Sequence, residues 1–191
     1  MRFLLDIALV ILIATVTGFS TAWLAVERGH PFGDVIVGPW AAWPSAGGPD
    51  ADPYSVALLA RTGEVPLGAG EGLAFTATHD SDGEILSGRC DYMIEGRTPP
   101  ARLWTLTVYD REGRLMNNAA RRAGFHSREV LRRADGGMQI AVSPSVKPGD
   151  WLPVGRVAEP RLVLRLYDTP LTTATEFIGI DMPQITRGTC E

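Results

Sequence analysis

The sequence predicts an all-β domain, an antiparallel β-sandwich of jelly-roll type with one short helix, preceded by a single N-terminal transmembrane helix. Three features support this prediction: short segments of alternating apolar and polar residues, frequent turn residues between them, and a long apolar run near the N-terminus. The 21 glycines and 14 prolines in 191 residues favour many short strands over long helices. The net charge of −4 gives no reason to expect nucleic acid as a partner.

Five segments alternate with the period of two that is typical of half-buried strands. The residues expected on the core face are Leu73, Phe75 and Ala77; Cys90, Tyr92 and Ile94; Trp104, Leu106 and Val108; Met138, Ile140 and Val142; and Leu162, Leu164 and Leu166. Turn residues separate these segments, for example at 111–113 and 135–137. Because no helical pattern lies between the strands, a parallel α/β sheet is not expected.

Residues 1–28 are expected to form the membrane anchor. The run 4–26 contains Asp6 as its one charged residue, and as a helix it is long enough to cross a hydrocarbon core of about 30 Å. Trp23 stands near the far end, at the interfacial depth that tryptophan favours. A cleavable signal peptide is the alternative, because residues 20–22 (Ser-Thr-Ala) resemble a cleavage site. Either interpretation carries the rest of the chain across the membrane.

The expected anchor carries a stripe of small residues, Ala14, Gly18 and Ala22. Such a stripe permits close helix packing against a partner or a second copy, although small residues are also common in membrane spans by chance. Arg2 and Arg28 flank the span almost symmetrically, so the distribution of positive charge says little about its orientation.

Residues 29–51 are expected to be a connecting segment rich in Gly and Pro. Trp40 and Trp43 interrupt it and indicate that it packs against another part of the protein. The β-sandwich domain is then expected to span residues 52–191.

That domain should begin with one short helix. Asp52 is a good N-cap residue, Pro53 suits the first helical position, and Gly63 suits the position just beyond the end. We therefore expect about three turns of helix over residues 53–62.

Cys90 and Cys190 are the two cysteines of the chain. In an oxidising compartment an even number of cysteines favours a disulfide, which here would attach the C-terminus to the sheet. Two unrelated thiols are the alternative. A CxxC motif or a neighbouring histidine would indicate metal or redox chemistry, and neither is present.

Several motifs resemble those of the family named domain of unknown function 1214. They are Asp52-Pro53-Tyr54, residues 103–110 (LWTLTVYD), Gly113, Asn117-Asn118, Gly136, residues 149–153 (GDWLP), and residues 164–167 (LRLY) with Pro170. The resemblance covers most of the chain from Asp52 to Cys190, and it implies an envelope protein with a β-sandwich fold. Such proteins are often linked to a sister domain of unknown function 1254, which is replaced here by the anchor. Asp150 stands where the family usually has Asn, and the resemblance assigns no catalytic residue.

The segment from Arg111 to Arg133 holds seven arginines against two glutamates, a net charge of +5 in a chain of −4. Because arginine suits bidentate capture of phosphate or carboxylate, its ligand would be an anionic lipid or an acidic glycan. The candidate ligand-binding residues are Arg121, Arg122, Arg132 and Arg133. The alternative is a pair of solvated loops whose arginines pair with nearby carboxylates.

Two further candidates for ligand binding are Trp151 and His126. Trp151 lies between Gly149 and Pro153, where it would either fill the core or stack on a ligand ring. His30, His79 and His126 are too scattered to indicate a metal site, so no metal, cofactor or catalytic residue is assigned.

Residues 80–84 (DSDGE) resemble the start of a calcium loop. The sixth position of an EF-hand loop requires glycine, and the sequence has isoleucine there. A polar hairpin turn is therefore expected instead.

These features favour a membrane-anchored, extracytoplasmic accessory or binding module of the bacterial envelope, without enzymatic activity. It would lie in the inner membrane as a single-pass protein with most of the chain in the periplasm, together with an envelope protein, lipid or glycan partner. The alternative is a hydrolase-like envelope enzyme with a pocket in the β-sandwich, in which His79 or His126 meets a carboxylate.

Overall fold

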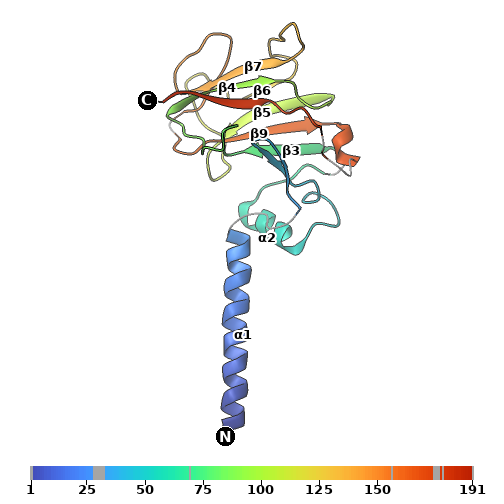
Figure 1. Ribbon diagram of the computed structural model, residues 1–191, viewed down its shortest axis with the longest axis vertical. Helices are drawn as coiled ribbons and strands as arrows, with labels where there is room; N and C mark the ends of the chain where they lie inside the picture. The colour runs from blue at the N-terminus through green and yellow to red at the C-terminus, as the bar shows by residue number, and fades with distance from the viewer. Residues whose placement is uncertain are drawn as a thin grey trace.

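The computed structural model describes residues 2–27, 33–68, 70–155, 157–173, 177 and 179–190. A long N-terminal helix ends beside a short one, which lies between the long helix and the β domain (Figure 1). In chain order the elements are α1 (Arg2–Glu27), β1 (Val35–Val37), β2 (Trp40–Ala42), α2 (Pro53–Thr62), β3 (Gly72–Ala77), β4 (Cys90–Gly96), β5 (Leu103–Tyr109), β6 (Gly124–His126), β7 (Met138–Ser143), β8 (Asp150–Pro153), β9 (Arg161–Tyr167), the 3₁₀ helix η1 (Pro170–Thr173) and β10 (Gln184–Cys190).

The strands form two sheets around one hydrophobic core. The larger sheet has the order β1-β2-β3-β9-β5-β6, and the smaller has the order β10-β4-β7-β8. Residues from both sheets, among them Phe75, Leu164 and Ile140, are fully buried and belong to one cluster. The mostly-β fold with two sheets is therefore confirmed, and the jelly-roll order stays a prediction.

The core faces of the five predicted strands are confirmed. Every residue expected on those faces is buried, and polar neighbours such as Gln139 and Thr76 point away from the core. The alternation predicted these strands because successive side chains of a strand point to opposite faces of the sheet, one toward the core and one toward solvent.

One strand pairing is not antiparallel, which corrects the prediction of an antiparallel sandwich. β7 and β8 pair in parallel, with Ile140 opposite Asp150 and Ser143 opposite Pro153. Parallel neighbours usually need a crossover of a dozen or more residues, yet the short segment 144–149 joins these two. Gly149 ends that segment with φ +78°, a backbone conformation that glycine adopts without strain.

The described part of the expected connecting segment, residues 33–51, contributes two strands to the β domain. β1 and β2 form a hairpin around Gly38, and β2 pairs with β3 at the edge of the larger sheet. Trp40 is completely buried there. Strands of three residues are too short for their alternation to be recognised, so the sequence did not predict that this segment contributes strands to the sheet.

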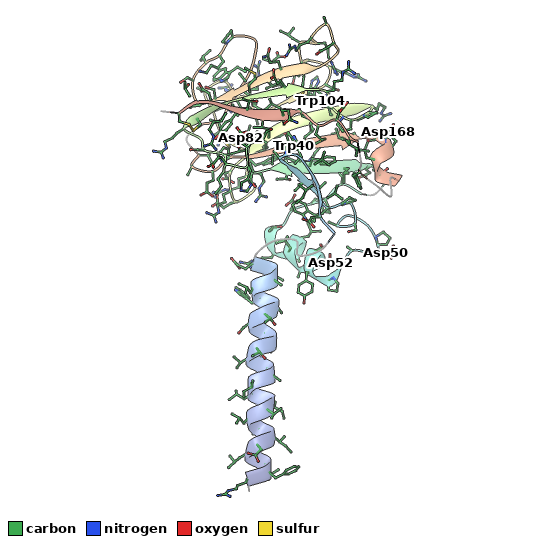
Figure 2. All side chains as sticks on the ribbon, in the orientation of Figure 1. Trp40, Asp50, Asp52, Asp82, Trp104 and Asp168 are labelled. Atoms are coloured by element: carbon green, nitrogen blue, oxygen red, sulfur yellow. A yellow bond between two sulfur atoms is a disulfide. The ribbon has the colours of Figure 1, made fainter. Side chains whose placement is uncertain are left out.

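Helix α2 agrees with the prediction residue by residue. The Asp52 carboxylate accepts hydrogen bonds from the backbone N–H groups of Tyr54 and Ser55 at 2.9 and 3.1 Å, and from the Ser55 hydroxyl. The bond from that hydroxyl, followed by the bond from the Ser55 backbone, lowers the pKa of Asp52 below its usual range. Gly63 ends the helix at φ +68° and donates to the Leu59 carbonyl. Figure 2 shows Asp52 at this helix, between α1 and the sheets.

Helix α1 is long and apolar enough to cross a membrane, and none of its residues is buried. The small residues Ala14, Gly18 and Ala22 lie exposed on it, so a packing partner for this stripe stays a prediction. The predicted disulfide between Cys90 and Cys190 is present. It joins β4 to β10 and thereby holds the end of the described chain on the smaller sheet.

Candidate functional site

A cavity of about 500 Å³ lies beneath α2, and we call it the α2 cavity. Its walls come from the end of α1, the segment 43–46, α2, the segment 64–67, and the outward faces of β3 and β9. Much of its surface is apolar, with contributions from Trp43, Leu58, Leu59, Pro66 and Leu67. This volume lies within the usual ligand-pocket range of about 300–1,000 Å³.

The local sequence explains why a cavity forms here. Leu58 and Leu59 are half-buried, whereas Val56 on the same helix is 53% exposed, so α2 turns one apolar side toward the sheet. The segments beside the helix approach each other closely at Gly47, where an added Cβ would lie 2.1 Å from the Leu67 carbonyl oxygen. Glycine is therefore required at this contact between two of the cavity walls.

The end of α1 is held on α2 by one arginine. A guanidinium nitrogen of Arg61 lies 2.5 Å from a carboxylate oxygen of Glu27, and the guanidinium carbon lies 5.1 Å from the centre of the Trp23 ring. Val26 and Glu27 also line the α2 cavity. The cavity consequently begins where the apolar helix ends.

The sheet side of the α2 cavity is polar. Arg161 begins β9, and the cavity is also lined by Thr76 on β3 and by Thr78 just beyond the end of that strand. A terminal nitrogen of Arg161 donates to the Arg111 carbonyl at 3.4 Å. Among the described residues no carboxylate lies within 4.0 Å of Arg161, so this half-buried cation lacks a neutralising partner.

Three of the arginines in the basic segment form ion pairs. The pairs join Arg111 to Glu159 at 3.3 Å, Arg114 to Asp110 at 2.8 Å, and Arg133 to Glu95 at 3.3 Å. This is the arrangement expected of solvated loops whose arginines pair with nearby carboxylates. Such exposed pairs contribute little to stability.

The four candidate arginines make different contacts. Arg122 stacks over the Phe125 ring at 4.7 Å and donates to the Trp151 carbonyl at 3.2 Å. Arg132 and Arg133 together line a second pocket, of about 370 Å³, on the smaller sheet. Arg121 stands in a left-handed turn at φ +52°. Anion binding by these four arginines therefore stays a prediction.

Trp151 is half-buried on β8 and does not fill the core. Its indole Nε1 donates to the carbonyl of Ser143 at 3.1 Å. The Trp151 backbone contacts Arg122, so the structure brings two of the predicted residues together. Asp150, which departs from the family pattern, accepts a bond from the Leu131 backbone at 2.7 Å.

Neither His79 nor His126 lines the α2 cavity. The two ring nitrogens of His126 contact its own turn: Nδ1 accepts from the Arg128 backbone at 3.3 Å, and Nε2 lies 3.5 Å from Glu129. The pairing of His126 with a carboxylate therefore closes a surface turn. His79 contacts the Thr78 hydroxyl at 3.0 Å, and His30 lies outside the described residues.

Residues 80–84 form the hairpin turn expected from the sequence. The Asp80 carboxylate accepts from the backbone of Asp82 and Glu84 and forms an ion pair with Arg187 at 2.8 Å. The Ser81 hydroxyl accepts from the Ile185 backbone at 2.9 Å. The turn therefore fastens β10 to the hairpin.

A polar cluster surrounds Asp91 on the outer face of the smaller sheet. Its carboxylate accepts from the Ser143 hydroxyl and the Lys147 ammonium, each at 2.5 Å, and from the Thr189 hydroxyl at 2.9 Å. Partial burial raises the pKa of Asp91, but the bonds from Lys147, Ser143 and Thr189 together outweigh it and lower the pKa below its usual range.

Sequence reasoning missed the α2 cavity and its arginines. Arg61 stands in the last turn of a helix that was predicted, and Arg161 stands at an outward position of a predicted strand. The sequence signal was available, because Arg161 and Arg165 are outward charges in a strand of leucines. The position of Arg161 in the same cavity as α2 depends on how that helix packs against the sheet.

The chain is similar to two solved structures. The VPA0106 protein of Vibrio parahaemolyticus has 25% sequence identity and a TM-score of 0.58, over 73% of this chain and 36% of that one. The present chain thus spans little more than a third of that structure. An uncharacterised protein from Burkholderia cenocepacia has 16% identity and a TM-score of 0.42, over 64% of this chain and 31% of that one. No curated protein matches with significance.

The family model named "Protein of unknown function (DUF1214)" matches residues 71–171. This region extends from the start of β3 to η1 and covers more than half of the chain. It contains the sheet wall of the α2 cavity, whereas α2 and α1 precede it. The chain therefore belongs to the DUF1214 family.

Proposed function

We propose that this protein is a single-pass, membrane-anchored binding module of the bacterial envelope, without enzymatic activity. Its β domain would lie on the periplasmic side of the inner membrane. The observation that carries the proposal is the position of the α2 cavity at the end of the apolar helix α1. A binding site in this place is available to molecules at the membrane surface.

Two further observations support the proposal. The contacts of Arg61 with Trp23 and Glu27 join the anchor to the domain, so α2 would lie at the membrane surface. The Cys90–Cys190 disulfide is typical of an oxidising compartment such as the periplasm.

A protein partner is part of the proposal. The VPA0106 structure is much longer than this chain, which covers 36% of it. We infer that the partner is a separate envelope protein, for example one with a domain of unknown function 1254. Mass spectrometry of proteins that co-purify with the full-length chain tests this inference, and a chain without any stoichiometric partner contradicts it.

The anchor and its compartment can be tested in bacterial cells. Alkaline extraction of membranes should leave the full-length protein in the membrane fraction, and its intact mass should include residues 1–28. Thiols trapped by alkylation before lysis should show Cys90 and Cys190 unmodified, because they are linked. A soluble, shortened product indicates a cleaved signal peptide instead, and two alkylated cysteines exclude the periplasm.

A further inference from the structure

The α2 cavity combines an apolar wall with a cation, Arg161, that forms no ion pair with any described residue. Leu58, Leu59 and Leu67 provide side chains against which an alkyl chain can pack. Burying such a chain is favourable because it removes apolar surface from water. The wall therefore favours a ligand with a long apolar part.

The charges of the cavity favour an anion at the sheet side. Arg61 and Glu27 neutralise each other, and Glu64 is exposed at the rim. Arg161 is half-buried and has no carboxylate within 4.0 Å among the described residues. A cation in such a place attracts an anion more strongly than one in open water, because the effective dielectric constant is lower.

The cavity also lies next to the end of α1, the helix proposed to span the membrane. Val26 and Glu27, at the end of α1, form part of its lining. If α1 spans the bilayer as proposed, these residues lie at the surface of the lipid. A molecule that leaves the bilayer beside α1 thus reaches the cavity directly.

We propose that the α2 cavity binds a single-chain anionic amphiphile, of the fatty-acid class, from the membrane. The alkyl chain lies against the leucines of α2 and the segment 64–67, and the carboxylate faces Arg161 and Thr76. The size of the cavity, about 500 Å³, suits one small ligand. This inference rests on the proposed function, because the ligand comes from the bilayer that holds α1.

The test uses the full-length chain in lipid nanodiscs with two photoreactive probes. One probe is a fatty acid with a diazirine on its chain, and the other is a phosphatidylglycerol with the same group. After irradiation, mass spectrometry locates the labelled residues. The fatty acid should label α2 at Leu58 or Leu59, and an excess of unlabelled fatty acid should remove that label. Val56, which is exposed on the same helix, should stay unlabelled.

Two variants with matched controls examine the contacts. Leu59→Trp fills the cavity and should abolish the label on α2, whereas Val56→Trp, on the exposed side, should retain it. Arg161→Gln removes the cation and should weaken the label even if Leu59→Trp does not fold. Arg128→Gln, an exposed arginine outside the cavity, should have no effect.

Label on α1 separates the two proposals. Both probes should label α1, because a membrane-spanning helix contacts lipid. If α1 is labelled but α2 carries no label that excess unlabelled fatty acid removes, the amphiphile site is contradicted and the membrane anchor is still supported. Label of α2 by the phosphatidylglycerol alone also overturns the amphiphile site, because the occupant is then a bilayer phospholipid. The absence of label on α1 overturns the anchor itself.

Discussion

The indole Nε1 of Trp40 donates a hydrogen bond to the carbonyl oxygen of Pro183 at a distance of 2.7 Å, within the buried core. Trp40 belongs to β2 of the larger sheet, and Pro183 directly precedes β10 of the smaller sheet. The bond therefore connects the two sheets across 143 positions of sequence. Figure 2 shows both Trp40 and Trp104 within the β domain.

Replacing Trp40 tests how much this bond contributes. Trp40→Phe keeps an aromatic ring but leaves the buried Pro183 carbonyl without its donor, at an expected cost of about 1–3 kcal/mol in addition to lost packing. Trp104→Phe is the matched control, because Trp104 is 2% exposed and its Nε1 has no acceptor among the described residues. Thermal unfolding of the full-length protein in detergent should show the larger decrease for Trp40→Phe. Equal decreases contradict a contribution from the bond.

Loss of the disulfide should destabilise the β domain. Cys90 and Cys190 are separated by 100 positions, and removal of such a native bond typically costs about 2–5 kcal/mol. Cys190→Ser and Cys90→Ala should each lower the unfolding temperature, and so should reduction of the wild-type protein. The double variant should not fall by the sum of the two, because both remove the same bond. A Cys190→Ser variant that unfolds like the wild type contradicts this prediction.

The cluster around Asp91 predicts a specific dependence of stability on pH. The pKa of Asp91 is lower in the folded chain than its ordinary value of 3.8, so the ionised carboxylate stabilises the fold above that pH. This contribution disappears as the pH falls through the lower folded pKa. The difference in unfolding temperature between the wild type and Asp91→Asn should be constant near neutral pH and should shrink below about pH 4.

Asp82→Asn, in an exposed turn, provides the comparison for Asp91. At each pH, the unfolding temperature of each variant is subtracted from that of the wild type. The difference removes the effect of all other carboxylates, because these titrate in both proteins. If the difference for Asp91→Asn stays constant down to the acid transition, the bonds from Ser143, Lys147 and Thr189 do not lower the pKa of Asp91.

Arg122 should matter for stability and not for anion binding. Its guanidinium stacks over Phe125 and donates to the Trp151 carbonyl, so Arg122→Ala should cost about 1 kcal/mol. Arg121→Ala, at the neighbouring exposed position, is the control and should be close to neutral. Sedimentation with acidic liposomes should be equal for the two variants. Selective loss of sedimentation for Arg122→Ala would return this residue to the ligand-binding candidates.

The sequence by itself determined the local elements of this protein. The alternation of Leu162, Leu164 and Leu166 indicated a strand because each side chain must choose the core or the solvent, and Asp52 with Gly63 marked both ends of α2 through capping. The apolar run of α1 was evident from composition, since a membrane span needs length and few charges.

The tertiary structure alone decided which elements meet. The short strand β2 belongs to the larger sheet, β8 lies parallel to β7, and α2 lies over β3 so that Arg61 and Arg161 line one cavity. These relationships join residues far apart in the chain, and one sequence contains no periodic signal for them. A local pattern predicts a strand or a helix but does not determine which other elements lie beside it. Packing of the whole core selects these neighbours.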